Sequence, residues 1–319
     1  MAPLIPYISI PELPLTFLTQ IPILGERLNA SHPPSIKPFG TLVALGVYLG
    51  SVVAMRHGRQ RGIDDKKLSE FIFWVVGLGF VGAHVLDAIF YHPAQVAKDP
   101  LYLFMLWEGL SSYGGFIGAV SGIFLWRWRR KQSVLLMSEM IASAFPLAWV
   151  FGRMGCATVH DHPGMLSDAW YAVRWPMPGG ITVGRLDLGL IEMVLTIPLA
   201  AAFLWAWHKK PMRPLGFYTG WMCVAYAPVR FILDFLRVNE TEAHVGGGGD
   251  PRYAGLTPAQ WACFAFLALG IYLVRLAKQN EARGVVGDPQ SDDAAPPSSD
   301  ADASDDGEAT REKAPASTP

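Results

Sequence analysis

The stretch "LGLIEMVLTIPLAAAFLWAW", residues 188–207, carries a single charged side chain, Glu192. A helix needs about 20 apolar residues to cross the roughly 30 Å hydrocarbon layer of a membrane. Backbone hydrogen bonds inside lipid must be satisfied within the segment, so a run of this kind is expected to be helical. Six other runs have a similar character: 39–55, 70–91, 114–128, 134–152, 215–236 and 259–277. The sequence therefore predicts an all-α polytopic membrane protein with seven transmembrane helices.

The composition agrees with this class of protein. Of the 319 residues, 51% are hydrophobic and 17% are charged, whereas soluble domains average about a quarter charged. The net charge of −1 gives no reason to expect a nucleic-acid partner. The three cysteines are scattered singly, which predicts neither a disulfide framework nor a zinc site, and no cofactor is expected. The N-terminus lacks the basic-then-apolar pattern of a cleavable signal peptide.

The basic residues of the loops predict an orientation. Loops 56–67, 127–132 and 208–214 carry five, four and three Lys/Arg, and the intervening loops 92–113, 153–187 and 237–258 carry one, three and two. Basic loops stay on the cytoplasmic side. We therefore expect the N-terminus and loop 153–187 on the outer side of the bacterial inner membrane, and the C-terminus in the cytoplasm.

Three regions are expected along the chain. Residues 1–38 are apolar but punctuated by prolines, and are predicted to lie along the outer membrane interface. Residues 39–277 form the seven-helix membrane domain. Residues 278–319 become acidic, proline-rich and low in complexity, a composition that cannot bury enough surface to fold. This last region is predicted to be a disordered cytoplasmic tail.

Ionisable residues within or beside membrane spans are costly and indicate function. Arg153 follows the fourth span, and Arg230 lies within the sixth. An arginine inside a helix can simply form an ion pair with an acid one turn away, as Arg230 and Asp234 would. Two arginines on the outer side also favour the binding of an anion, and phosphate suits the forked donors of a guanidinium. Further polar positions in or near spans are His84, Asp87, Glu192, Tyr226, Arg237 and the segment "EGLSSYGG" (108–115).

Several of these motifs together resemble the prolipoprotein diacylglyceryl transferase family. The resemblance covers about residues 36–277 and rests on the glycine–arginine motif at 152–164, "YAPVRFILDFLR" (226–237), "LTPAQ" (256–260), "GLSSYGG" and "KPFG". It implies transfer of a diacylglyceryl group from phosphatidylglycerol to the lipobox cysteine of a secreted preprolipoprotein. It also implies that the arginines hold the lipid phosphate, and it assigns further substrate-binding positions to Phe39, Tyr113, Gly114, Gly115, Gly164, Glu192 and Tyr226.

The chain departs from the family pattern at groups that would handle protons. Cys156 and Val159 stand where the family signature has asparagines, and Asp161 stands where it has glutamate. The family's histidine before the paired glycines is Tyr113 here. Three further departures are Phe39 for a first-span tyrosine, His84 for a second-span arginine, and "GLIE" (189–192) for "QLYE".

The stretch "CATVHDHPG" (156–164) has three readings. Cys156, His160 and His162 are possible metal ligands, although their spacing fits no standard zinc pattern and Arg153 would repel a cation. The stretch can also be an ordinary polar loop. In the third reading, His160 or His162, with Asp161 orienting the ring, is the acid–base group of the catalytic site together with Arg153 and Arg230.

The expected function is thus that of a transferase in lipoprotein biosynthesis, with phosphatidylglycerol and lipobox preprolipoproteins as partners. Two alternatives remain open at this stage. One is a related transferase that uses another acceptor. The other is a non-catalytic membrane protein that binds phospholipid or handles lipoproteins.

Overall fold

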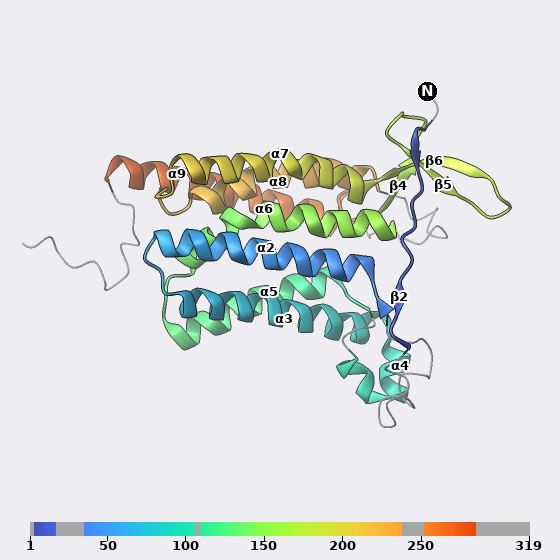
Figure 1. Ribbon diagram of the computed structural model, residues 1–319, viewed down its shortest axis with the longest axis horizontal. Helices are drawn as coiled ribbons and strands as arrows, with labels where there is room; N and C mark the ends of the chain where they lie inside the picture. Colours follow the sequence, from blue (N-terminus) through green and yellow to red (C-terminus); the bar gives the residue numbers. More distant parts are fainter. Residues whose placement is uncertain (1–2, 17–34, 106–108, 238–251, 285–319) are drawn as a thin grey trace, which may run out of the picture.

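The computed structural model describes residues 3–16, 35–105, 109–237 and 252–284, and its long helices run side by side (Figure 1). These are α2 (Pro38–Gln60), α3 (Asp65–Tyr91), α5 (Ser112–Arg130), α6 (Val134–Val159), α7 (Leu188–Lys209), α8 (Phe217–Phe235) and α9 (Pro258–Ala282). Two short helices, α4 (Pro93–Lys98) and the 3-10 helix η2 (Pro100–Phe104), separate α3 from α5.

Helix α6 joins the parts of the bundle. It packs extensively against α2 and α7 and also contacts α8, while α3 pairs with α5 and α8 pairs with α9. Buried side chains of α3, α5 and α6 form one core cluster around Phe71, Trp126 and Met140. A second cluster joins α6, α7 and α8 around Phe203 and Tyr218. Residues far apart in the sequence therefore meet along α6.

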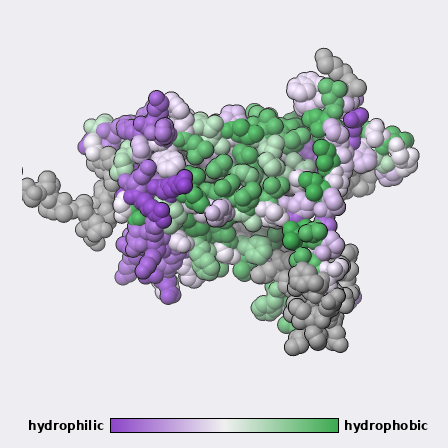
Figure 2. Space-filling view, viewed as in Figure 1, coloured by the Kyte–Doolittle hydropathy of each residue, from purple (hydrophilic) through white to green (hydrophobic). Residues whose placement is uncertain are grey.

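Among the described residues, five helices are long and apolar enough to cross a membrane: α2, α3, α6, α7 and α9. Helices α5 and α8 do not meet this criterion, although each lies in the same bundle at the position of an expected span. Helix α5 ends in Arg127, Arg129 and Arg130, and α8 carries Arg230 and Asp234. Hydrophobic residues cover the flank of the bundle, and hydrophilic residues gather at the end opposite the sheet (Figure 2). The chain is a mostly helical, multi-pass membrane protein.

A small β-sheet covers the other end of the bundle, which the all-α prediction did not include (Figure 1). Its strands are β1 (Ile5–Pro6), β4 (Pro163–Leu166), β5 (Val173–Pro176) and β6 (Thr182–Asp187), in the order β1-β5-β6-β4. Strand β1 pairs in parallel with β5, and the other pairs are antiparallel. A separate antiparallel pair joins β2 (Leu13–Pro14) to β3 (Ser35–Ile36). Strands this short leave too little alternation to be recognised in a polar loop.

The start of helix α8 is fixed by a buried carboxylate from α6. Gly216 precedes the helix at φ 93°, a left-handed conformation that favours glycine, and provides no side-chain cap. Glu139 instead accepts hydrogen bonds from the backbone N–H groups of Tyr218 (2.9 Å) and Thr219 (2.8 Å). A negative charge there also suits the helix dipole. This contact fixes α8, and with it Arg230, relative to α6.

The glycine-rich segment at the expected third span enters helix α5 at Ser112. Ser111 caps α5, and Gly114 and Gly115 lie in its first turn, packed against α3. A Cβ added to Gly114 would meet the carbonyl oxygen of Gly82, so glycine is required for this close approach. At the other end of the chain, α9 continues to Ala282 and so passes residue 277, where the membrane domain was expected to end.

Candidate active site

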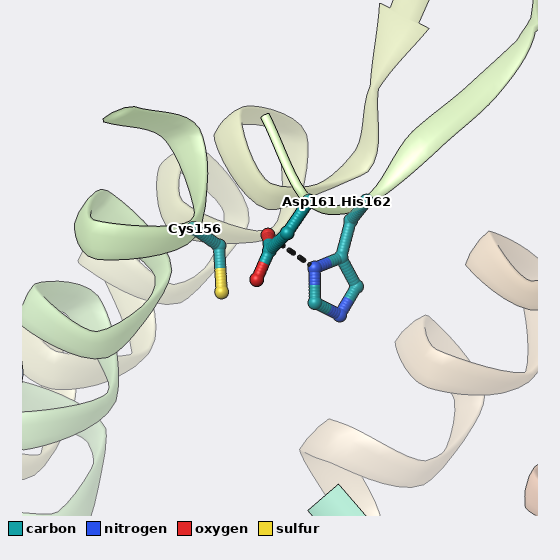
Figure 3. Close-up of side chains that lie close together, drawn as sticks. All are labelled: Cys156, Asp161 and His162. Carbon is teal, nitrogen blue, oxygen red and sulfur yellow. Dashed lines mark hydrogen bonds and ion pairs between the residues drawn. The ribbon is translucent and has the colours of Figure 1, made fainter. Parts of the chain in front are cut away.

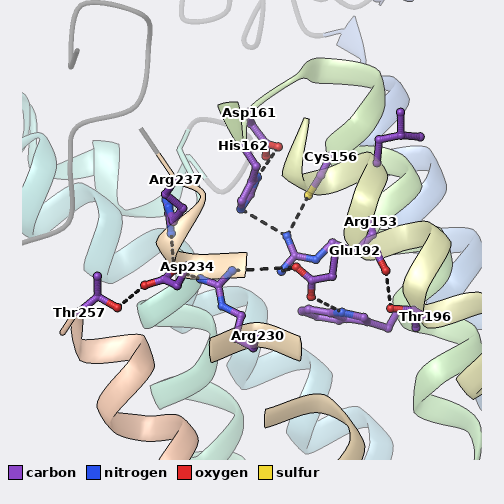
Figure 4. Close-up of polar contacts among 12 residues, drawn as sticks. Arg153, Cys156, Asp161, His162, Glu192, Thr196, Arg230, Asp234, Arg237 and Thr257 are labelled. Carbon is purple, nitrogen blue, oxygen red and sulfur yellow. Dashed lines mark hydrogen bonds and ion pairs between the residues drawn. The ribbon is translucent and has the colours of Figure 1, made fainter. Parts of the chain in front are cut away.

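The end of the bundle beside the sheet holds a cluster of buried charged residues (Figure 4). Arg153 lies near the C-terminal end of α6 and is 8% exposed. Its Nη2 lies 3.0 Å from Oε2 of Glu192 in α7, and its guanidinium stacks over the ring of Trp149 at 4.7 Å. Trp149 also donates a hydrogen bond to Oε1 of the same glutamate at 2.9 Å. The Arg153 guanidinium is therefore held by a carboxylate and an aromatic face together.

Arg230 reaches the same carboxylate from the opposite side. Its Nη1 lies 4.0 Å from Oε2 of Glu192, and its Nη2 lies 3.1 Å from Oδ1 of Asp234, one turn further along α8. The helix is expected to present residues four apart on one face, and it does so here. The ion pair with Asp234 and the approach to Arg153 thus occur together. Two guanidinium groups from α6 and α8 share one buried acid.

Asp234 explains the motif "LTPAQ" that precedes α9. The hydroxyl of Thr257 donates to Oδ2 of this fully buried aspartate, and Arg237 lies 3.7 Å from its Oδ1. Thr257 and Gln260 also form a reciprocal capping box at the start of α9. The motif therefore joins the N-terminus of α9 to the charged face of α8.

The two histidines of the loop have different partners. Nδ1 of His162 lies 2.6 Å from Oδ1 of Asp161, and its Nε2 lies 3.3 Å from Nη1 of Arg153. The Sγ of Cys156 accepts from the same Nη1 at 3.8 Å. Of the histidines singled out in the loop, His162 is the one that reaches the arginine cluster, and Asp161 is its carboxylate partner.

His160 is held in the small sheet instead. Its Nδ1 lies 2.6 Å from Oδ2 of Asp187, its Nε2 lies 3.1 Å from the carbonyl oxygen of Ile8, and its ring stacks on Tyr7 with 3.9 Å between centroids. Burial, with a further contribution from the charge of Asp187, raises the pKa of the Tyr7 hydroxyl. Asp187 also caps α7 by accepting from the N–H of Leu190. An aspartate directly before an apolar run is the signal that could have identified it.

The cluster of Cys156, Asp161 and His162 resembles a metal site at first sight, because their potential ligand atoms lie within 4.8 Å of one another (Figure 3). The sequence had suggested Cys156, His160 and His162 as possible metal ligands, so Asp161 takes the place of His160 in the observed cluster. Here the guanidinium of Arg153 donates to both the sulfur and the imidazole nitrogen. A metal cation at these ligands would lie beside a fixed positive charge, so the donor set does not fit a metal ion.

The remaining positions expected to bind substrate are more dispersed. Tyr226 lies one turn before Arg230, and its ring meets the ring of Trp149 edge to face, with 5.9 Å between the ring centroids. Phe39 packs against Gly155 of α6, where a Cβ would lie 3.0 Å from the phenylalanine ring. Gly164 bridges to Arg237 and has no room for a side chain. Gly114 and Gly115 lie at the contact between α3 and α5. The backbone of Tyr113 is in α5, and its side chain lies outside the described part.

His84, which stands where the family pattern has arginine, supports the segment between α3 and α5. It is fully buried, and its two ring nitrogens lie 3.1 Å from the carbonyl oxygen of Gly109 and 3.0 Å from that of Tyr102. Asp87, one turn later, lies 3.5 Å from Nε2 of His92. Both groups hold this segment against α3.

Comparison with known proteins identifies relatives of this chain. The family "Prolipoprotein diacylglyceryl transferase" matches residues 28–276. Proteins named phosphatidylglycerol–prolipoprotein diacylglyceryl transferase are similar over most of their lengths. The one from Idiomarina loihiensis is 29% identical over 69% of this chain and 80% of its own. The one from Polynucleobacter asymbioticus is 30% identical over 67% of this chain and 79% of its own. The one from Pseudoalteromonas atlantica is 26% identical over 86% of this chain and 96% of its own. The chain therefore belongs to the prolipoprotein diacylglyceryl transferase family.

Proposed function

We propose that this chain transfers the diacylglyceryl group of phosphatidylglycerol to the cysteine thiol of lipobox-containing preprolipoproteins. The names of its relatives include both substrates. The observation that carries the proposal is the pair of guanidinium groups, the buried Arg153 and the partly buried Arg230, that share the buried Glu192 at the sheet end of the bundle. Such a pair is suited to a lipid phosphate, because each guanidinium can donate two parallel hydrogen bonds to phosphate oxygens.

The two arginines act on the leaving group. A thiolate attacks the glyceryl carbon next to the phosphate, the carbon–oxygen bond breaks, and the phosphate of the departing glycerol phosphate gains one negative charge as it does so. Donors fixed in a buried site stabilise such developing charge. The Nε atom of Arg153 is buried and has no hydrogen-bond partner among the described residues, so a donor is available for the phosphate. Glu192 holds both guanidinium groups in place before the lipid arrives.

His162 and Asp161 supply the base. A cysteine thiol has a pKa near 8.5, so most of it is protonated at neutral pH and must lose its proton to react. The imidazole of His162 contacts the arginine cluster, and Asp161 fixes its orientation through the 2.6 Å contact. His160 is bound to Asp187 and Ile8, so it supports the fold of the loop.

The site faces the outer side of the bacterial inner membrane in this proposal. All seven long helices cross the bilayer, with the basic loops and the tail in the cytoplasm, and the sheet lies outside. The five sufficiently apolar helices support the crossing of the bilayer, and the basic loops at the hydrophilic end in Figure 2 support this orientation. The N-terminal segment runs beside the sheet end and exposes Leu4, Ile8 and Leu13, as expected of a segment at the lipid interface.

The arginines provide the direct test. Purified variants Arg153→Ala and Arg230→Ala are assayed with phosphatidylglycerol and a lipobox peptide, and each is expected to lose at least about 10²-fold in transfer rate, the usual loss for one donor to a developing negative charge. Lysine is expected to rescue only in part, because it lacks the bidentate fork. Arg174→Ala is the matched control, since Arg174 is exposed on β5 and lies outside the cluster. Full activity in both cluster variants would exclude the phosphate role.

A further inference from the structure

The protonation pattern of His162 follows from its two partners. A guanidinium only donates hydrogen bonds, so the 3.3 Å contact from Nη1 of Arg153 requires Nε2 of His162 to be the acceptor. Nδ1 then carries the proton and donates it to Oδ1 of Asp161 at 2.6 Å. The ring is therefore a neutral imidazole whose lone pair on Nε2 is already occupied. That lone pair is the one a base needs.

We propose that Arg153 controls the order of the reaction. Its guanidinium occupies Nε2 of His162, and the ring can act as a base only after the phosphate of the lipid has drawn the guanidinium away. This inference rests on the proposed function, because it assigns a phosphate to Arg153 and a base role to His162. Arg153 already divides its donors between the two, with Nη2 on Glu192 and Nη1 on His162. Any anion that takes up these donors changes the state of the imidazole.

Phosphate is a better partner for the guanidinium than the imidazole nitrogen is. A phosphate oxygen is charged, and it accepts shorter and stronger hydrogen bonds than a neutral ring nitrogen does. The 3.3 Å contact to Nε2 is longer than the 3.0 Å contact to the carboxylate of Glu192. The contact to the imidazole is thus the weaker one, so a phosphate that binds the Nε left without a partner among the described residues and turns the guanidinium towards its oxygens replaces this contact first.

The charges around the site favour the same order. Among the described residues, three arginines and three carboxylates are linked around the site, directly or through His162: Arg153, Arg230, Arg237, Asp161, Glu192 and Asp234. Their charges cancel when His162 is neutral. A bound phosphate diester adds one negative charge, and this charge stabilises an imidazolium formed beside it. Lipid binding therefore both frees the lone pair and favours the charge that the ring acquires.

The chemical step then proceeds with both substrates bound. The thiol gives its proton to Nε2 of His162, and the sulfur forms a bond with the glyceryl carbon that carries the phosphate. The bond between that carbon and the phosphate oxygen breaks, and glycerol phosphate leaves with the bonding electron pair. The proton on His162 passes to the departing phosphate, after which Arg153 returns to Nε2. Without lipid, Arg153 occupies Nε2 of His162, so the imidazole cannot accept the proton of the thiol.

The contact is tested first without any turnover. The protein is labelled with ¹⁵N-histidine in a non-ionic detergent, the His162 signals are assigned by comparison with His162→Gln, and dioleoyl phosphatidylglycerol is added. The Nε2 signal of His162 is expected to move on lipid binding, whereas the His160 signals serve as the internal control and stay in place. In Arg153→Gln, the Nε2 signal should already differ without lipid and should no longer respond to it.

An unchanged Nε2 signal in a protein that binds lipid and transfers would overturn the coupling and leave the proposed function intact. A protein that does not bind phosphatidylglycerol would overturn both.

Discussion

Replacing His160 or His162 by alanine is predicted to affect two different quantities, the stability of the fold and the transfer rate. His160→Ala should mainly lower stability, because the ring is 7% exposed, lies 2.6 Å from the carboxylate of Asp187, and stacks on Tyr7. His162→Ala should mainly lower the transfer rate, because its partner Asp161 is 41% exposed and water can replace the lost contact. The structure thus separates two residues that are neighbours in the sequence.

The size of each effect follows from these contacts. A hydrogen bond to a buried charged group contributes about 1.5–3 kcal/mol, and an aromatic stack contributes about 0.5–1.5 kcal/mol. His160→Ala should therefore lower the free energy of unfolding by about 2–4 kcal/mol, which corresponds to about 4–8 °C in the unfolding midpoint at ~2 °C per kcal/mol. Loss of a general base costs about 10²–10⁴-fold in rate, and this is the loss expected for His162→Ala.

Both quantities are measured on the same detergent-purified proteins. Tryptophan fluorescence follows thermal unfolding, and transfer to a lipobox peptide is measured well below the midpoint, where both variants are folded. Asp187→Asn should reproduce only the hydrogen-bond part of this loss, because the stack on Tyr7 remains, and adding it to His160→Ala should change little, since the two residues share one contact. If His160→Ala loses transfer at unchanged stability while His162→Ala remains active, the assignment of the two histidines is wrong.

Three further outcomes are expected. Glu192→Gln keeps the hydrogen bond from Trp149 but removes the negative charge that competes with phosphate for the arginines, so KM for phosphatidylglycerol should fall. The kcat should fall as well, because the arginines lose the carboxylate that holds them in place. Unchanged values of both would contradict this preorganising role of Glu192. In a parent protein without Cys156, Cys223 and Cys263, single cysteines in the basic loops should resist an impermeant maleimide in intact spheroplasts, while Ser167→Cys should react. The reverse labelling would show that the proposed orientation is wrong. Truncation after residue 284 should leave the transfer rate unchanged because the acidic tail has the composition of an unfolded segment, and a large loss at equal protein level would reveal a role for it.

The membrane class of the protein could be predicted because hydrophobic runs act locally. A run such as 188–207 must be helical in lipid whatever surrounds it, so each expected span corresponds to a helix of the bundle. Even here, the apolar criterion alone finds five of the seven helices. Helix α8 falls short because it carries the charged residues of the site. The function places polar groups where the hydropathy pattern would exclude them.

The small sheet could not be predicted in the same way. Strand β1 holds two residues and pairs with β5, more than 160 residues later. Such a pairing leaves no local pattern, because its hydrogen bonds join segments that are distant in the sequence. His160 shows the consequence. Its spacing next to Asp161 and His162 indicated a catalytic group, but β1 brings Tyr7 and Ile8 over it, and Asp187 binds its Nδ1.

The sequence by itself indicated which residues are candidates for the chemistry, since arginines beside apolar spans are costly and suit phosphate. Only the tertiary structure decided how they combine. Arg153, Glu192 and Arg230 come from three helices, and they meet because α6 packs against α7 and α8. The choice of His162 over His160 depends in the same way on contacts between distant segments. Helical periodicity fixes which side chains share a face, but the packing of one helix against another depends on the shapes and charges of both.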